Sequence, residues 1–395
     1  MIVIADDITG AAEIAGIAFA RGEAVRLVCG CATATNLISN TTVIATDTRS
    51  MSEADAIAET RHIVSHLLTS SPSHPLTPSP SHPLTSSPPH HLTSSPPHPL
   101  TSSLPHLYKK VDSALRGHVV AELTTLMQAT GCQRVIYLPA NPSKGRIIRG
   151  GIYYINHVPI HETAFSYDPE FPARTSLLQE RFPDAANKGI IMPDAESEED
   201  IRKVIEEYND GKTIFAGAAD LFSALLANHG DRLDDLRHAT VTGVSRHDSL
   251  ILCGSTQSKP LEFGIPIAQM PREIYDGSDN LSLWDTSAYA EQHSLILSIP
   301  HTHRTGKDVA VHLRAMMAEK ARQLVAVHRP DHLIIEGGAT AWATLQALGW
   351  TDFAITAQLA PGVVQMSATN GTLVTLKPGS YPWGDIKQSR SYLPV

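Results

Sequence analysis

The chain opens on MIVIADDITGAAEIAGIAFARG, residues 1–22, and this stretch decides the fold class. The apolar run at residues 2–5 predicts a short buried strand. Asp6 and Asp7 follow at once, and the alanine-rich segment after them predicts a helix whose glycines permit close packing. A strand, a polar turn and a helix in this order are typical of an α/β fold built on a parallel sheet.

The same pattern returns later in the first half of the chain, where apolar runs at 43–45, 108–111 and 135–138 each end in polar residues. In an open α/β sheet, ligands bind beyond the carboxyl ends of the parallel strands, so these polar residues should meet at one edge. The residues expected there are Asp6, Asp7, Asp47, Arg49, Lys110, Asp112, Ser113 and Arg116.

The mixture of acidic and basic side chains at this edge predicts the chemistry of the ligand. Carboxylates accept hydrogen bonds from hydroxyl groups, while Arg and Lys bind carboxylates and phosphates. We therefore expect a small, polyhydroxylated and anionic ligand. Each aspartate taken alone is also explained as a helix cap or as a surface charge.

Strands in the second half of the chain are followed by glycine-rich turns. Such turns expose backbone amides at the start of a helix, where the helix dipole and the amide donors hold phosphate. This pattern predicts a nucleotide site, although ordinary tight turns also use glycine. The residues expected at the site are Gly254, Ser255, Gly337, Gly338, Ala339, Thr340, Gly362, Lys377 and Gly379.

Better-known nucleotide motifs fail in this sequence. Gly306 and Lys307 resemble the end of a P-loop, but Asp308 follows where a P-loop has Ser or Thr. No GxGxxG follows the opening strand, which disfavours a dinucleotide cofactor.

Composition and charge exclude several classes of protein. A length of 395 residues favours two domains. The formal charge of −9 and the absence of a basic run argue against nucleic acid as a partner. No apolar run approaches the length of a membrane helix and no signal peptide opens the chain, so we expect a cytoplasmic protein without a membrane partner. The four cysteines lack CxxC spacing, and we expect buried thiols and no metal site.

Residues 68–107 form a low-complexity insertion. Versions of LTSSPPHP recur every eight residues, and the segment carries no Asp, Glu, Lys or Arg. Proline at this density removes amide donors and prevents a helix, so we expect an extended, solvated loop. The alternative is a nickel or zinc site, since neutral imidazole is a good ligand for both metals.

Taken together, motifs along nearly the whole chain resemble the four-carbon acid sugar kinase family. They are IADDITGAAEIAG (4–16), TDTR (46–49), KKVDSALRG (109–117), GGIYYINHVPIHETAFSYDP (150–169), GST (254–256), EGGAT (336–340), APGV (360–363) and LKPG (376–379).

The resemblance implies a fold, an activity and roles for individual residues. The fold would be α/β with two domains, each a mainly parallel sheet flanked by helices, and with the ligands in the cleft between them. Residues 1–240 would bind a sugar acid, and residues 241–395 would bind ATP. The activity would be phosphorylation, with ATP and Mg²⁺, of the 4-hydroxyl of D-threonate, D-erythronate or 3-oxo-tetronate. Asp7 would accept the hydroxyl proton or, alternatively, only hydrogen-bond the substrate.

The sequence departs from the family pattern at two places. The repeat lies just before Lys110, so its ends must lie close together or the following strand is displaced. The final loop has its second glycine delayed, at Gly384, which puts its geometry over ATP in question. A sugar-acid sensor without turnover and, less favoured, a sugar-acid dehydrogenase therefore remain as alternatives. The oligomeric state is left open, a homo-oligomer included.

Overall fold

The structure is a computed structural model that describes residues 1–30, 40–70, 107–168, 170–228, 248–254, 264–300 and 306–379. Several expectations lie outside these residues. They are the position of Ser255, nearly all of the octapeptide repeat, the delayed final glycine and the expected domain boundary between residues 240 and 241.

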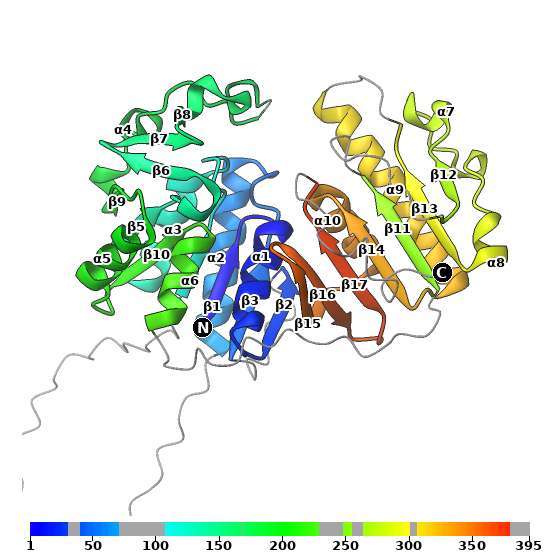
Figure 1. Ribbon diagram of the computed structural model, residues 1–395, viewed down its shortest axis with the longest axis horizontal. Helices are drawn as coiled ribbons and strands as arrows, with labels where there is room; N and C mark the ends of the chain where they lie inside the picture. Colours follow the sequence, from blue (N-terminus) through cyan, green and yellow to red (C-terminus); the bar gives the residue numbers. More distant parts are fainter. Residues whose placement is uncertain are drawn as a thin grey trace, which may run out of the picture.

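A single large sheet runs through both halves of the molecule (Figure 1). Its fourteen strands lie in the order β12-β13-β11-β14-β17-β16-β15-β2-β3-β1-β4-β10-β5-β9. In the N-terminal half the strands are all parallel: β1 (Ile2–Ala5), β2 (Val25–Cys29), β3 (Thr41–Ala45), β4 (Leu107–Lys110), β5 (Arg134–Leu138), β9 (Ile190–Ile191) and β10 (Thr213–Gly217).

The C-terminal half contributes five parallel strands and an antiparallel hairpin. The parallel strands are β11 (Ser249–Cys253), β12 (Ile267–Gln269), β13 (Ser294–Ser298), β14 (His332–Glu336) and β17 (Leu373–Lys377). The hairpin consists of β15 (Asp352–Ala360) and β16 (Val363–Ala368). Strands β11, β13, β14 and β17 are largely buried because helices cover both faces of a parallel sheet, whereas β12 at the edge of the sheet is exposed.

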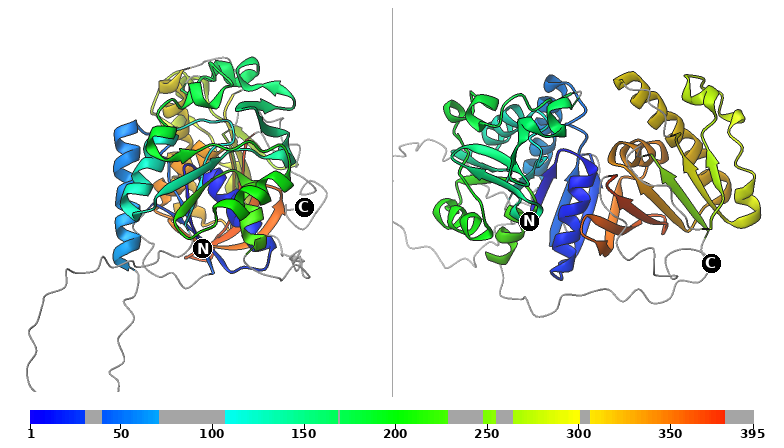
Figure 2. Two further views of the ribbon diagram at one scale, coloured as in Figure 1. Left: turned by 90° about the vertical axis from the view of Figure 1, so that its left-hand side faces the viewer. Right: turned by 45° about the horizontal axis from the view of Figure 1, so that its top comes forward.

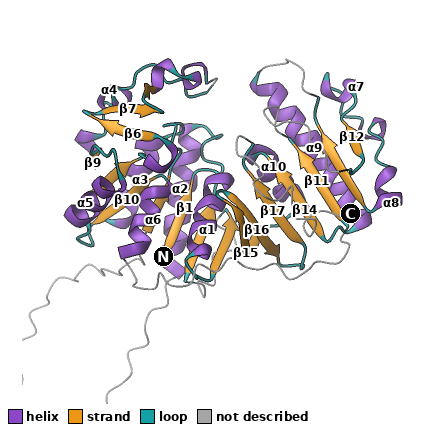
Figure 3. Ribbon diagram, in the orientation of Figure 1, coloured by secondary structure: helices purple, strands orange, loops and turns teal. Residues whose placement is uncertain are grey.

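Helices flank the sheet, as Figure 3 shows. The longer ones are α1 (Ile8–Ala20), α2 (Glu53–Ser70), α3 (Val119–Thr130), α5 (Glu198–Tyr208), α6 (Ala219–Asn228), α9 (Lys307–His328) and α10 (Gly338–Leu348). Short ones are α4 (Leu178–Arg181), α7 (Arg272–Tyr275), α8 (Ala288–Gln292), η1 (Pro142–Lys144), η2 (Ile160–Glu162), η3 (Ala164–Tyr167), η4 (Ala186–Lys188) and η5 (Leu281–Leu283). No helix in the described part of the chain is long and apolar enough to span a membrane.

A small antiparallel sheet follows β5 and stands apart from the large one. It is formed by β6 (Arg146–Arg149), β7 (Ile152–Ile155) and β8 (Val158–Pro159). Asn156 and His157 both have positive φ, 49° and 67°, and so form the tight turn between β7 and β8.

The predicted α/β class is confirmed, with one refinement. The sheets of the two halves are not separate, because β2 and β15 pair antiparallel at Asp352 to Val28. Arg26 strengthens this seam by donating from Nε and Nη2 to the Asp352 carboxylate at 2.7 and 2.6 Å. The right-hand view of Figure 2 shows the blue to green N-terminal residues and the yellow to red C-terminal residues as two lobes that meet along this seam.

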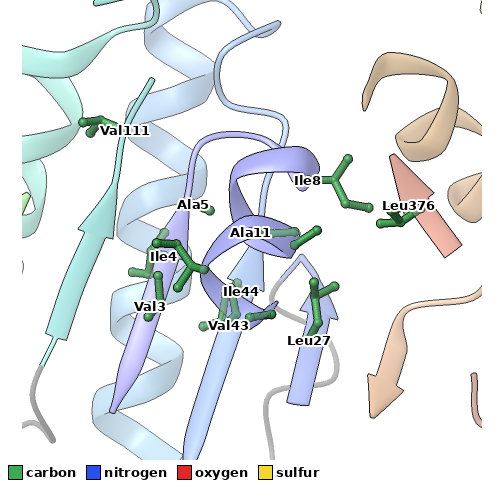
Figure 4. Packing of buried hydrophobic residues seen from close by; sticks show 14 of the residues in the cluster. Val3, Ile4, Ala5, Ile8, Ala11, Leu27, Val43, Ile44, Val111 and Leu376 are labelled. Atoms are coloured by element: carbon green, nitrogen blue, oxygen red, sulfur yellow. The ribbon is translucent and has the colours of Figure 1, made fainter. Parts of the chain in front are cut away.

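One hydrophobic core also crosses the seam. Figure 4 shows Ile8 of α1 beside Leu376 of β17, and both belong to the cluster that contains Val3 and Val43. A Cβ atom at Gly16 would lie 2.7 Å from Cγ1 of Val364, so α1 packs on β16 as closely as the predicted glycine packing requires. The shared core fixes the two halves relative to each other.

The strand that follows the repeat is not displaced. β4 pairs with β1 in regular parallel register, from Leu107 opposite Ile2 to Lys110 opposite Ala5. The polar residues after β4 therefore lie next to those after β1, as the strand-end pattern predicts.

Candidate functional site

A cleft of about 1030 Å³ lies between the two halves of the molecule. Asp7 and Asp47, which follow β1 and β3, line it on the N-terminal side. Gly254, which follows β11, and residues 338–340 at the start of α10 line it on the other side. The predicted meeting of strand ends from both halves therefore occurs at one cavity.

Asp7 lines the cleft and also begins α1. Its Oδ1 accepts a hydrogen bond of 2.8 Å from the backbone N–H of Gly10, and its Oδ2 accepts one from the Thr9 hydroxyl. Burial acts to raise the pKa of Asp7, but the charges of Arg49 and Lys110 together with these hydrogen bonds lower it below its ordinary value. Asp7 is therefore an ionised carboxylate at neutral pH.

Arg49 joins the carboxylates that follow β1 and β4. Its guanidinium lies 2.9 Å from Asp6, 3.1 Å from Asp7 and 3.8 Å from Asp112. Burial acts to lower the pKa of Arg49, but the three carboxylates raise it well above its ordinary value. Asp6 lies deepest, at 2% exposed, and burial raises its pKa despite the charge of Arg49.

The loop after β4 holds a second arginine against the same cluster. Arg116 donates from Nε and Nη2 to Asp112 at 2.7 and 3.1 Å, and its Nη1 lies 3.6 Å from Asp168. Against the effect of burial, the charges of Arg49 and Arg116 lower the pKa of Asp112. Leu115 has φ +63° inside this loop, a conformation that costs an ordinary side chain energy, and its carbonyl accepts from Arg181 at 3.0 Å.

Four of the residues expected at this edge do not line the cleft: Asp6, Lys110, Asp112 and Ser113. Lys110 is 3% exposed, and its Nζ donates to the Val111 carbonyl at 3.0 Å and lies 3.7 Å from Glu13 of α1. Ser113 accepts a hydrogen bond from Arg146 of β6. Asp6 and Asp112 lie 2.9 and 3.8 Å from the guanidinium of Arg49, which does line the cleft.

The C-terminal half lies close to Asp7 at the first turn of α10. A Cβ atom at Gly338 would lie 2.8 Å from Cγ2 of Thr9 and 3.7 Å from Oδ2 of Asp7. A Cβ atom at Gly254 would lie 1.9 Å from Oγ1 of Thr340. A side chain at either position would therefore collide with a threonine unless that threonine moved, and residues 338–340 line the cavity.

The remaining described residues expected near a nucleotide do not line the cleft. Lys377 is 2% exposed and donates to the carboxylate of Glu336, which is fully buried, and to the carbonyl of Pro378 at 3.1 Å. Gly337 precedes α10 with φ +100°. Gly362, at the turn between β15 and β16, and Gly379 are likewise not among the residues that line the cleft.

Sequence reasoning missed the contribution of α9. Lys307 and Arg314 of this helix line the cleft. Tyr167 and Asp168, at the end of η3, line it as well. Lys307 lies 2.8 Å from Glu170, which joins the two halves at the rim. A polar helical residue has the same pattern whether it faces water or a ligand, so only the position of α9 identifies these residues.

The described residues include no group of three or more His, Cys, Asp or Glu side chains placed to hold a metal ion. Metal ions such as Mg²⁺ usually keep several waters and bind through one or two carboxylates plus substrate phosphates. Asp7 and Asp47 at the cavity wall are carboxylates of the required kind.

Two family models match the chain, one in each of the halves that meet at the cleft. A sugar-binding N-terminal domain matches residues 1–76 and 100–185, and a nucleotide-binding C-terminal domain matches residues 233–381. The residues skipped inside the first match, 77–99, all fall in the octapeptide repeat. Residues 77–99 are thus an insertion relative to the family model.

Individual relatives support the same grouping. The chain is 25% identical over 254 residues to a D-threonate kinase of Salmonella typhimurium, a match covering 57% of this chain and 53% of that protein. It is 25% identical over 295 residues to a D-threonate kinase of Bordetella bronchiseptica, covering 67% and 71%. The chain thus matches only about half the length of the Salmonella relative.

Solved structures agree in fold. A Haemophilus influenzae protein has a TM-score of 0.67 at 19% identity over 100% of both chains. A Salmonella typhimurium protein has a TM-score of 0.70 at 19% identity over 98% of both chains. With matching models for both halves and kinases among its relatives, the chain belongs to the four-carbon acid sugar kinase family.

Proposed function

We propose that this protein uses ATP to phosphorylate the 4-hydroxyl of a four-carbon sugar acid, such as D-threonate, D-erythronate or 3-oxo-tetronate. The observation that carries the proposal is the single cleft in which Asp7 and Arg49 oppose the start of α10. Relatives named D-threonate kinase and D-erythronate kinase support the substrate class. In this proposal residues 1–240 bind the sugar acid and residues 241–395 bind ATP.

The N-terminal side of the cleft suits a hydroxylated acid. Arg116, with a side chain 31% exposed, is the arginine of the cluster most open to a ligand carboxylate, and Arg49 is only 16% exposed. Charge-assisted bonds from arginine to a carboxylate are strong and directional. Asp7 and Asp47 would accept hydrogen bonds from the substrate hydroxyls, while Lys110, Asp112 and Ser113 hold this wall in place.

The opposite side of the cleft suits a phosphate chain. The first amides of a helix have no partner within the helix, and the dipole of α10, eleven residues long, favours an anion there. Residues 338–340 supply these amides to the cavity. The chemistry that Mg-ATP supplies when bound is a transferable phosphoryl group with part of its charge neutralised.

The proposal is tested by incubating the purified protein with ATP, Mg²⁺ and a panel of four-carbon acids. We expect ADP release only with certain acids, and a product heavier by one phosphoryl group on the 4-oxygen. Binding of a sugar acid without ADP release with any member of the panel would contradict the kinase and favour a sensor. Reduction of a nicotinamide cofactor would instead indicate the dehydrogenase.

Gly338→Ala tests the phosphate side. We expect nucleotide binding to weaken at least about 10-fold, because the new methyl group would meet Thr9 at 2.8 Å and displace the start of α10. Calorimetric titration with ATP measures the change.

The matched control for this variant adds Thr9→Ser, which removes the atom that the new methyl group would meet. That atom is Cγ2, and serine keeps the hydroxyl that donates to Asp7. The double variant should regain most of the ATP affinity. Undiminished ATP binding by Gly338→Ala alone would show that the start of α10 does not hold the nucleotide.

A further inference from the structure

Arg314 lies on α9, two helical turns after Lys307, and its side chain lines the cleft from the nucleotide half. It is partly exposed, between the buried residues Leu313 and Met317 of the same helix. The buried neighbours fix the face of α9 that meets the cleft, so Arg314 is held toward the cavity.

The other cations that line the cleft are already engaged. Arg49 is shared by three carboxylates, Arg116 lies against Asp112 and Asp168, and Lys307 is paired with Glu170. Within the part of the chain that the structure describes, Arg314 makes neither a hydrogen bond nor an ion pair. Its guanidinium is therefore available to an anionic ligand.

The charge of Arg314 acts on a residue of the sugar half. Burial raises the pKa of Asp47, while the hydrogen bond from Ser50 at 2.9 Å and the charge of Arg314 oppose this rise. The guanidinium of a residue from the nucleotide half thus lies within electrostatic range of a residue from the sugar half. Both residues line the cleft between the halves.

On the basis of the proposed function, we propose that Arg314 is a catalytic residue that binds the γ-phosphoryl group during transfer. In this step a bond forms between the 4-oxygen of the sugar acid and the γ-phosphorus. The bond from that phosphorus to the ADP oxygen breaks, ADP leaves with the electron pair, and the hydroxyl proton passes to Asp7. The planar donors of arginine match the negative oxygens of the phosphoryl group in the transition state of transfer.

A purely structural role makes a different prediction. If Arg314 only attracted Asp47 and so held the two halves together, removing either residue would have the same effect. Removing Arg314 would then also weaken the binding of every nucleotide equally. The two roles are therefore separable by comparing ligands with and without a γ-phosphate.

The experiment compares Arg314→Ala, Arg314→Lys and Asp47→Asn with the control Arg322→Ala. Arg322 lies on the same helix, is paired with Glu319 at 2.7 Å and does not line the cleft. We expect Arg314→Ala to lower kcat about 10²–10³-fold, as loss of a preorganised donor to transition-state charge does, and Arg314→Lys to lower it less. Added guanidinium should restore part of the Arg314→Ala activity, and Arg322→Ala should behave as the unmodified protein.

Binding measurements test the same contact without turnover. Arg314→Ala should weaken a non-hydrolysable ATP analogue at least about 10-fold and leave ADP binding within about 2-fold. Equal loss for both nucleotides, or no recovery of Arg314→Ala activity with added guanidinium, would overturn the proposal.

The binding data also separate this proposal from the proposed function. If the unmodified protein binds both nucleotides yet phosphorylates no four-carbon acid, the proposed function fails. The ratio of analogue to ADP affinity then decides alone whether Arg314 contacts the γ-phosphate. If the unmodified protein binds no nucleotide, both proposals fall.

Discussion

Arg49→Ala is expected to lower the free energy of unfolding by about 3–5 kcal/mol and to abolish sugar-acid binding, because buried carboxylates lose their shared cation. The loss of stabilisation is largest for Asp6, because it is 2% exposed and accepts two hydrogen bonds from Arg49, at 3.1 and 2.9 Å. Thermal unfolding and calorimetric titration with the acid substrate measure the two effects.

The effect of pH on this variant has a definite sign. In the unmodified protein the pKa values of Asp7 and Asp112 are lowered, so their stabilising contribution is present above the unfolded pKa of about 3.9 and is lost as the pH falls through the folded values. Without the charge of Arg49, the pKa of Asp6, which burial already raises, rises further. Stability should then fall as the pH rises above about 4, so Arg49→Ala should regain stability between pH 7 and pH 5.

Arg26→Ala is the matched control, because it removes another arginine of the N-terminal half that has a bidentate carboxylate partner, Asp352. The Arg26 and Asp352 side chains are 20% and 25% exposed, so solvent screens the pair and the expected loss is about 1 kcal/mol or less. Equal losses in the two variants, or unchanged acid binding in Arg49→Ala, would contradict the assignment of Arg49 to the sugar site.

Asp7→Asn is expected to lower kcat about 100-fold or more, because an amide cannot accept the proton of the substrate hydroxyl. The fold should tolerate the change, since asparagine also caps helices and can accept from the Gly10 N–H as Asp7 does. Steady-state kinetics with both substrates measure the loss. The lowered pKa of Asp7 places any acidic limb of the pH–rate profile that it causes below its ordinary titration range.

Asp55→Asn provides the control for Asp7. Asp55 lies in the first turn of α2, accepts from Ser52 at 2.7 Å and does not line the cleft, so its replacement should leave kcat unchanged. A rise in KM alone for Asp7→Asn, with kcat retained, would reassign Asp7 from proton acceptor to substrate binding.

The polar turns at the strand ends could be predicted from the sequence for a simple reason. A parallel strand is buried on both faces, so its apolar run ends abruptly where the chain reaches the ligand edge. Asp7, Asp47 and Arg49 were located in this way, and Gly338 was located by the glycine turn after β14. All four line the cleft.

The sequence could not show which neighbours of these residues reach the ligand. Lys110 follows the same strand-end pattern as Asp112, yet its side chain turns toward Glu13 and away from the cavity. Adjacent residues in a strand point to opposite faces, and the long side chains after a strand take whichever charged partner the packing offers.

The sequence by itself determined the α/β class, the sugar-acid and nucleotide characters of the two halves and most of the strand-end residues, because these depend on local patterns of apolar and polar residues. Only the tertiary structure decided that β10 lies between β4 and β5, that β2 pairs with β15, and that Arg314 and Asp47 line the same cleft. Each of these contacts joins residues far apart in the chain. Strand edges and polar helix faces accept many partners equally well, and the shared core around Ile8 and Leu376 selects one arrangement.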